Sequence, residues 1–261
     1  MEEKIAAVKM RNITKTFGSV TANDKVWLDI YKGEILALLG ENGSGKTTLM
    51  NMLSGIYFPD EGDIFIGEEK VVIRSPRDAF DHGIGMIHQH FKLVDVLTAA
   101  ENIVLGLEEK LDLKAASRKI REICEAYGFE GDPEQKIYDM SVSQKQTVEI
   151  VKVLYRGADI LILDEPTNGL DPSGIHEIRN LIKSLPALYD CTVLISSHLL
   201  SEIELVADDI GILNHGRLLF EGSLNDLRQN ALKAGFAADN LEDMFLSMID
   251  KDNTSRKQRI R

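Results

Sequence analysis

The chain has 261 residues, and its 30 basic and 42 acidic residues give a formal net charge of 30 − 42 = −12. This length buries an ample core without a disulfide or metal cross-link, and the acidic balance disfavours a general nucleic-acid binder. Cys124 and Cys191 lie far apart, so we expect no disulfide framework and no paired-cysteine metal site. No apolar run approaches the roughly 20 residues that span a bilayer, and the first residues do not resemble a signal peptide. We therefore expect a soluble chain that works at a membrane only through a partner.

The first 90 residues carry strand patterns around one helix. We expect an edge strand over residues 4–13, a second strand over residues 26–30, and a strand buried on both faces at Ile35–Leu39, where the run is wholly apolar. A glycine-rich turn and a helix at Lys46–Leu53 come next. Further strands are expected over residues 63–66, 85–87, 160–163 and 192–195, with a hairpin over residues 210–221.

Residues 97–156 show a different pattern, because apolar residues recur there at helical spacing and no strand signal is present. This segment is expected to be a helical insert within an α/β sheet domain. Two helical segments are expected after residue 224. The polar and basic residues 251–261 have no period, and we expect a frayed tail there.

Residues 40–47 match the phosphate-loop pattern GxxxxGK[ST] between the buried strand and the helix. Its glycines allow backbone N–H groups to turn toward phosphate oxygens, and the helix points its N-terminus at the same anion. Lys46 is expected to reach the β- and γ-phosphates, and the Thr47 hydroxyl to bind Mg²⁺. The predicted nucleotide-binding residues of this region are Gly40, Asn42, Gly43, Ser44, Gly45, Lys46, Thr47 and Thr48.

A second apolar run, over residues 160–163, ends in two acids, Asp164 and Glu165. A strand that ends beside the phosphate loop would place Asp164 near the metal. Glu165 would then lie where a water attacks the γ-phosphate, as a general base or a water-positioning group. Without the phosphate loop, the same pattern would indicate only a buried strand that meets a polar turn.

Taken together, the motifs resemble those of ABC-transporter ATPase subunits, in the order found in that family. They are residues 40–48, Gln89, residues 141–144, residues 164–172 and His198. The resemblance implies an α/β fold of the P-loop NTPase (RecA-like) class, with a mixed sheet core, an antiparallel β subdomain and an inserted helical subdomain. It implies that ATP and Mg²⁺ are bound, and that hydrolysis by an ATPase is coupled to transport.

Single residues take roles from the same resemblance. Phe17 is similar to the aromatic residue that stacks on adenine, although a core phenylalanine is the alternative. Gln89 is similar to the glutamine that touches Mg²⁺ or water and senses the membrane subunit. Asp171 is similar to the aspartate that crosses the interface between two ATPase subunits, and His198 to the histidine that contacts the γ-phosphate. The expected catalytic set is Glu165, His198, Lys46 and Gln89, and the expected metal set is Thr47, Gln89 and Asp164.

Residues 141–144 resemble the signature motif that contacts the nucleotide of the other subunit, but they depart from it. The family usually has Leu-Ser-Gly-Gly-Gln, and this chain has Met-Ser-Val-Ser-Gln over residues 140–144. Ser141, Ser143 and Gln144 are the expected contacts, although Ser141 and Gln144 also form the pattern of a helix-capping box. The altered motif leaves a catalytically weak, regulatory nucleotide-binding module as an alternative. A soluble ATPase that acts on nucleic acid or ribosomes is disfavoured by the acidic balance.

The resemblance has two parts. Up to about Leu163 the chain resembles nucleoside and simple-sugar importer ATPases, and beyond it peptide-antibiotic (bacitracin or lantibiotic) exporter ATPases. We therefore expect a mosaic or chimera, and an engineered chimera without a membrane partner stays an alternative. The expected domains are a nucleotide-binding core with its β subdomain over residues 1–90 and 157–222, a helical subdomain over residues 91–156, and a helical extension with a basic tail over residues 223–261.

The expected partners follow from the family. They are ATP, a second ATPase subunit (the same or a related one) on ATP binding, and separate transmembrane permease subunits, with no nucleic acid. The implied location is cytoplasmic, on the inner face of the cell membrane.

Overall fold

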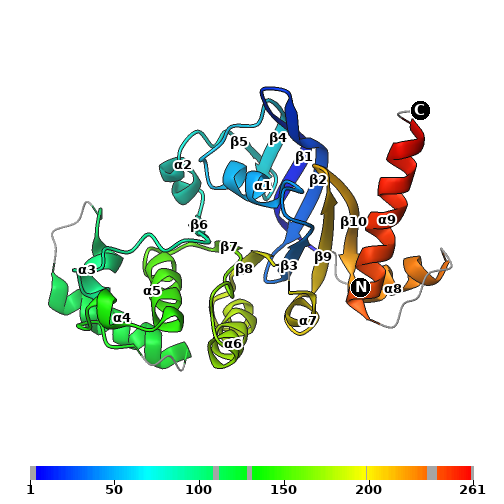
Figure 1. Cartoon of the computed structure of the whole chain (residues 1–261). Coiled ribbons are helices and arrows are strands. Elements are labelled where there is room, and N and C mark those ends of the chain that lie inside the picture. Colours follow the sequence, from blue (N-terminus) through cyan, green and yellow to red (C-terminus); the bar gives the residue numbers. More distant parts are fainter. Residues whose placement is uncertain (1–3, 108–111, 128–130, 198, 234–239, 260–261) are drawn as a thin grey trace.

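A computed structural model describes residues 4–107, 112–127, 131–197, 199–233 and 240–259. Its strands form two sheets (Figure 1). The first is antiparallel, in the order β2-β1-β4-β5, and contains β1 (Ala6–Phe17), β2 (Val20–Tyr31), β4 (Glu61–Ile66) and β5 (Glu69–Val71). The second has the order β10-β9-β3-β8-β7-β6 and contains β3 (Ile35–Leu39), β6 (Ile84–Ile87), β7 (Ile160–Asp164), β8 (Thr192–Ser196), β9 (Asp209–Asn214) and β10 (Arg217–Ser223). It is parallel except for the β9–β10 hairpin, so the expected mixed sheet and antiparallel subdomain are confirmed.

The central strand β3 is buried on both faces, because side chains alternate between two cores along a strand. Ile35 and Leu39 belong to the larger core, which the helices behind the second sheet complete. Leu36 and Leu38 belong to the core that fills the space between the two sheets, together with helix α1. A wholly apolar run is therefore what this position requires.

The helices lie around the two sheets, and α3, α4 and α5 stand apart from them as a cluster (Figure 1). Their bounds are α1 (Lys46–Leu53), α2 (Pro76–Asp81), α3 (Ala99–Val104), α4 (Leu113–Tyr127), α5 (Val142–Tyr155), α6 (Pro172–Tyr189), α7 (Leu200–Ile203), α8 (Leu224–Lys233) and α9 (Leu241–Arg259), with a short 3₁₀ turn at Ile137–Asp139. Within the described ranges, none of them is both long enough and apolar enough to cross a bilayer.

Helices α3, α4 and α5 pack around a core of their own, as the helical spacing of residues 97–156 predicts. They meet the second sheet where α5 lies against β6. Gly85 of β6 faces Val153 of α5 so closely that a Cβ at residue 85 would stand 2.0 Å from the Val153 Cγ1 atom. At this point the Val153 side chain of α5 packs directly on the backbone of β6.

Two expectations about the chain ends are wrong. The first strand is not an edge strand, since β1 pairs with β2 on one side and β4 on the other, and it runs to Phe17. The expected frayed tail is instead the end of α9, which continues to Arg259. Helix α9 is held through buried Met244, Phe245 and Ile249, so its ordering comes from tertiary packing that the period of the last residues does not reveal.

Candidate functional site

The phosphate loop connects β3 to α1 in a conformation that needs its glycines. Gly43 and Gly45 have φ angles of 81° and 105°, in the left-handed region. A Cβ on Gly45 would also stand 2.3 Å from the carbonyl oxygen of Ala22 in the neighbouring hairpin. The loop is held from outside as well, because the Gly216 N–H donates to the carbonyl of Ser44 at 2.8 Å.

Lys46 lies across this loop. Its Nζ atom donates to the carbonyl oxygens of Gly40 at 2.7 Å and Glu41 at 3.2 Å, and the residue is buried. Burial lowers the pKa of the Lys46 ammonium, while the negative charges of Glu165 and Asp164 act in the opposite direction. A buried cation above turned backbone N–H groups is an arrangement that binds a polyanion.

The two acids at the end of β7 are held by the neighbouring strand β8. The Ser196 hydroxyl donates to Asp164 Oδ1 at 2.6 Å and accepts from the Glu165 N–H at 3.0 Å. Glu165 has a φ of 51°, unusual for a residue with a side chain, and the second hydrogen bond of its N–H, to the Ser196 carbonyl, fixes that turn. Ser196, which the sequence analysis did not single out, thus positions both acids.

Asp164 also meets the start of α1, where the Thr47 hydroxyl donates to its Oδ1 atom at 3.4 Å. A hydroxyl and a carboxylate are the oxygen donors that Mg²⁺ prefers. In the described part of the chain, no group of three or more His, Cys, Asp or Glu side chains could hold a metal ion. The pair therefore fits a Mg²⁺ ion that takes its remaining ligands from phosphate and water, and it does not form an all-protein cage.

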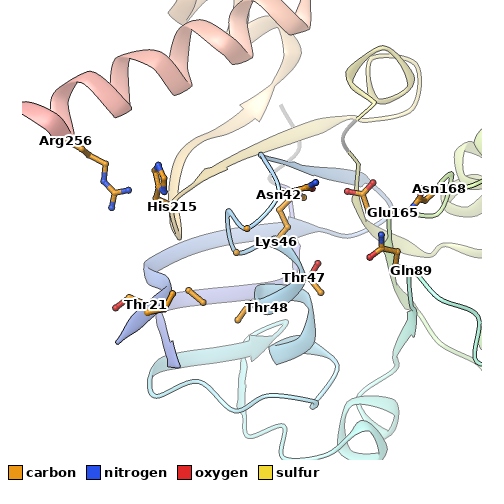
Figure 2. Close-up of a pocket in the computed structure, with 14 residues that line it drawn as sticks. Thr21, Asn42, Lys46, Thr47, Thr48, Gln89, Glu165, Asn168, His215 and Arg256 are labelled. Carbon is orange, nitrogen blue, oxygen red and sulfur yellow. The ribbon is translucent and has the colours of Figure 1, made fainter. Parts of the chain in front are cut away.

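A cavity of about 540 Å³ opens over the phosphate loop (Figure 2). Its lining residues are Val20, Thr21, Ala22, Asn42, Gly43, Gly45, Lys46, Thr47, Thr48, Gln89, Glu165, Asn168, His215 and Arg256. Figure 2 shows Gln89, Glu165 and Asn168 at one end, Thr21, His215 and Arg256 at the other, and Lys46 between them. Six of the eight predicted loop residues thus come together with Gln89 and Glu165 around one cavity, while Gly40 and Ser44 are not part of its lining.

Phe17 does not line this cavity. It ends β1 with 43% of its surface exposed, and its ring stands edge-on to that of Tyr57 with 5.1 Å between centroids. This exposure contradicts the alternative of a core phenylalanine, and the stacking of Phe17 on adenine stays a prediction. The expected γ-phosphate contact, His198, lies outside the described residues.

The signature residues and Asp171 lie outside the cavity lining, at the starts of two helices. Ser141 caps α5, with its hydroxyl accepting from the Gln144 N–H at 3.2 Å and the Gln144 side chain accepting from the Ser141 N–H at 2.9 Å. The capping-box interpretation is thereby confirmed. Ser143 Oγ lies 3.0 Å from Ser141 Oγ. Asp171 caps α6 by accepting from the Gly174 N–H at 2.8 Å.

Six cavity residues were missed from the sequence: Val20, Thr21, Ala22, Asn168, His215 and Arg256. Asn168 stands in the motif that follows Glu165, so its position was a usable signal. His215 is in the turn of the expected hairpin. Nothing local points to Arg256, because only the path of α9 brings it to the cavity.

Comparison with known proteins gives the family context. Residues 23–168, more than half of the chain, match the family described as ABC transporter. Among solved structures, a nucleotide-free ATP-binding cassette from an ABC transporter superposes with a TM-score of 0.77 at 26% identity, covering 88% of this chain and 96% of that one. The expected P-loop fold, with its mixed sheet and antiparallel β subdomain, is thus confirmed.

Two curated relatives are import proteins. The nucleoside import ATP-binding protein NupA of Lactococcus lactis subsp. cremoris (strain MG1363) is 49% identical over 223 residues, 84% of this chain and 44% of the relative. The ribose import ATP-binding protein RbsA of Clostridium tetani (strain Massachusetts / E88) is 37% identical over 251 residues, 94% of this chain and 49% of the relative. The chain thus spans about half the length of these relatives.

These alignments bear on the expected mosaic. The 223 residues aligned with NupA outnumber the 163 that precede the expected junction, so the likeness to an import protein continues beyond Leu163. Neither the exporter-like second half nor a chimeric origin receives support.

Proposed function

Because the chain belongs to the ABC transporter family, we propose that it binds and hydrolyses Mg·ATP to drive the import of a nucleoside or simple sugar through separate membrane subunits. The observation that carries the proposal is that Lys46 and Glu165 both line the cavity over the phosphate loop. A nucleoside is favoured over a sugar, since identity is 49% to the nucleoside import relative and 37% to the ribose import relative.

In the proposed reaction, water attacks the γ-phosphorus in line with its bond to the β–γ bridging oxygen; that bond breaks, ADP leaves and inorganic phosphate forms. Glu165 orients this water and accepts its proton, and Lys46 offsets the charge that develops on the γ-phosphate oxygens. Thr47 and Asp164 would hold Mg²⁺, which supplies further charge neutralisation between the phosphates. Gln89 stands at the Glu165 end of the cavity, where it can hydrogen-bond the same water (Figure 2).

A second cavity supports the proposal that a membrane subunit binds this chain. It has about 600 Å³ and lies among α2, β6 and α5. Its wall includes His88, which directly precedes Gln89, and Lys92, whose N–H donates to the buried Glu149 carboxylate of α5 at 2.6 Å. An element of a permease seated there would press on the segment that carries Gln89. We propose this groove as the permease contact.

A separate observation supports pairing with a second ATPase subunit. Ser141, Ser143 and Gln144 lie away from the chain's own cavity, although the family motif they resemble contacts nucleotide. A second copy, or a related subunit, placed over the cavity would supply those contacts in trans.

The catalytic part is tested by phosphate release from purified protein. Glu165→Gln keeps the size of the side chain but removes the base, so turnover is expected to fall by about a hundredfold or more, with ATP binding retained. Glu177→Gln, at an exposed site of α6, is the matched control and should leave turnover unchanged. Wild-type turnover in Glu165→Gln would refute the assigned base. ATP binding without turnover in the wild-type chain would favour the regulatory module instead.

The transport part needs cells that produce the chain. A tagged copy is expected to co-purify with a membrane-spanning subunit, and loss of the chain should reduce uptake of a labelled nucleoside more than uptake of labelled ribose. A larger loss of ribose uptake would identify a sugar as the substrate.

A further inference from the structure

Helix α9 reaches the nucleotide cavity from the far end of the chain (Figures 1 and 2). Its first turns are fixed in the larger core through Leu241, Met244, Phe245 and Ile249. Further on, it is bound to the β9–β10 turn. The buried Asn214 side chain donates to Asp252 Oδ2 at 2.8 Å and to Asn253 Oδ1 at 3.2 Å.

Arg256 follows Asn253 by three residues, which places both on the same face of a helix. The contact that docks α9 onto the hairpin therefore also directs Arg256 at the cavity, which it lines together with His215. His215 is bound to the helix too, with its Nε2 atom 3.2 Å from Asn253 Oδ1. Among the residues that the structure describes, the Arg256 guanidinium has no hydrogen-bond or ion-pair partner. Its donors and its planar face are thus available to a ligand.

The two ends of the cavity carry different side chains. Glu165 and Gln89 lie at one end and Arg256, His215 and Thr21 at the other, with Lys46 between (Figure 2). If Glu165 acts on the γ-phosphate, as the proposed function requires, the α-phosphate, ribose and base extend toward Arg256. A guanidinium stacks on aromatic faces and donates to hydroxyls, and an imidazole ring also offers a stacking face.

We propose that Arg256 and His215 bind the nucleoside half of ATP, so that the C-terminal helix forms one wall of the nucleotide site and is further stabilised near Arg256 by the bound nucleotide. This inference rests on the proposed function for the direction of the nucleotide. It adds a contact to the nucleoside from within the cavity lining, while the stacking of Phe17, which lies outside that lining, stays a separate prediction.

The backbone conformation at His215 limits which residues can replace it. It and Gly216 have φ angles of 46° and 77° in the two-residue turn between β9 and β10, a turn that favours Asn-Gly. His215→Asn therefore keeps the turn and removes only the ring. For Arg256, lysine keeps the positive charge and loses the planar group.

The test is an equilibrium titration of the full chain with ATP, ADP and inorganic tripolyphosphate. Arg256→Ala is expected to weaken ATP and ADP binding by about five- to tenfold, typical of one desolvated cation–π or charged contact. Tripolyphosphate binding should stay unchanged, and Arg256→Lys should recover little of the loss. His215→Asn is expected to weaken both nucleotides as well, by about two- to fivefold. Arg228→Ala, exposed on the neighbouring α8, is the matched control.

A second readout follows helix α9 itself. ADP is expected to slow hydrogen exchange of the amides near Arg256 in the wild-type chain, and to do so much less in Arg256→Ala. Because Arg256 is partly exposed, the thermal unfolding of this variant without nucleotide should match that of the wild type.

The outcomes separate the two proposals. Nucleotide affinities that are unchanged in Arg256→Ala, or a loss that tripolyphosphate shares, would overturn the nucleoside contact and leave the proposed function standing. A wild-type chain that binds neither ATP nor ADP would overturn both.

Discussion

Lys46 makes its hydrogen bonds with the same backbone that is shaped for phosphate. Its charge is therefore expected to contribute to nucleotide affinity in the ground state as well as in the transition state. Lys46→Ala should weaken ATP binding by about ten- to hundredfold, the range for a lost charged hydrogen bond. An equilibrium titration measures this, with Lys183→Ala at an exposed site of α6 as the control. Equal ATP affinity in wild type and Lys46→Ala would contradict the role.

Glu221 lies where β10 meets β2, and it accepts from the Asp29 N–H at 2.9 Å. Burial raises the pKa of Glu221 to about 7 from an ordinary value of 4.5; the carboxylates of Asp29 and Asp209 act in the same direction, while the Asp29 N–H and the Arg11 charge oppose them. The folded chain thus holds this proton more tightly than the unfolded chain. The resulting stabilisation is complete below about pH 4.5 and is lost as the pH rises through 7.

Glu221→Gln should remove this pH dependence, because the amide keeps an oxygen for the Asp29 N–H and cannot ionise. Compared with wild type, the variant is expected to be more stable at pH 8 by about 1–2 kcal/mol, a value reduced for the partial exposure of the side chain, and nearly equal at pH 4. Urea unfolding at the two pH values measures the difference. A gap that is the same at both pH values would show that Glu221 ionisation does not contribute.

At the scale of single elements, prediction from sequence succeeded where one local pattern determines the structure. The apolar run at Ile35–Leu39 and the motif after it fixed β3, the loop and α1, since glycine positions and burial on both faces leave a signal in adjacent residues. The short β5 and α2 were not predicted, because three and six residues are too few to show a period. The partners of β1 and the docking of α9 depend on contacts between distant segments, so no local pattern carries them.

The same distinction applies to the candidate site. Lys46, Thr47, Asp164 and Glu165 were found because each stands at a strand or helix end inside a compact motif. Arg256 lies 41 residues after His215, and both residues lie still further along the chain from those motifs. Only the packing of α9 on the β9–β10 turn brings them to the cavity.

The start of α5 offers a test of the altered signature. Ser143 stands where the family has a glycine, and its hydroxyl lies beside that of Ser141, the serine that the family motif shares. Ser143→Gly is expected to raise ATP turnover by about two- to fivefold, since less side chain would stand before the nucleotide of a second subunit. It should also lower the free energy of unfolding by about 0.5–1 kcal/mol.

Ser173→Gly, at the same position of α6, supplies the stability reference for this change. Turnover is measured side by side as phosphate release. A slower Ser143→Gly enzyme would mean that the serine hydroxyl makes a useful contact with the nucleotide.

For the whole molecule, the net charge of −12 opposes association of two copies, and the proposed sandwich lacks its bridging ligand without ATP. The free chain is therefore expected to be mainly monomeric, and Glu165→Gln with Mg·ATP to form a dimer, with a related subunit as the alternative partner. Sedimentation velocity distinguishes these states, and adding Lys46→Ala to Glu165→Gln should abolish the dimer. A stable dimer without nucleotide would disprove this dependence.

The contact between Gly85 and Val153 limits how the helices α3–α5 can move relative to the second sheet. Here the Val153 side chain of helix α5 touches the strand backbone directly, because Gly85 has no side chain to stand between them. Repulsion at such a contact rises steeply, so we expect the helices α3–α5 to pivot about β6 more readily than they approach it. Gln89 follows Gly85 by four residues, near the axis of that pivot. A swing of the helices would thus carry the start of α5 through a wide arc while displacing Gln89 only slightly.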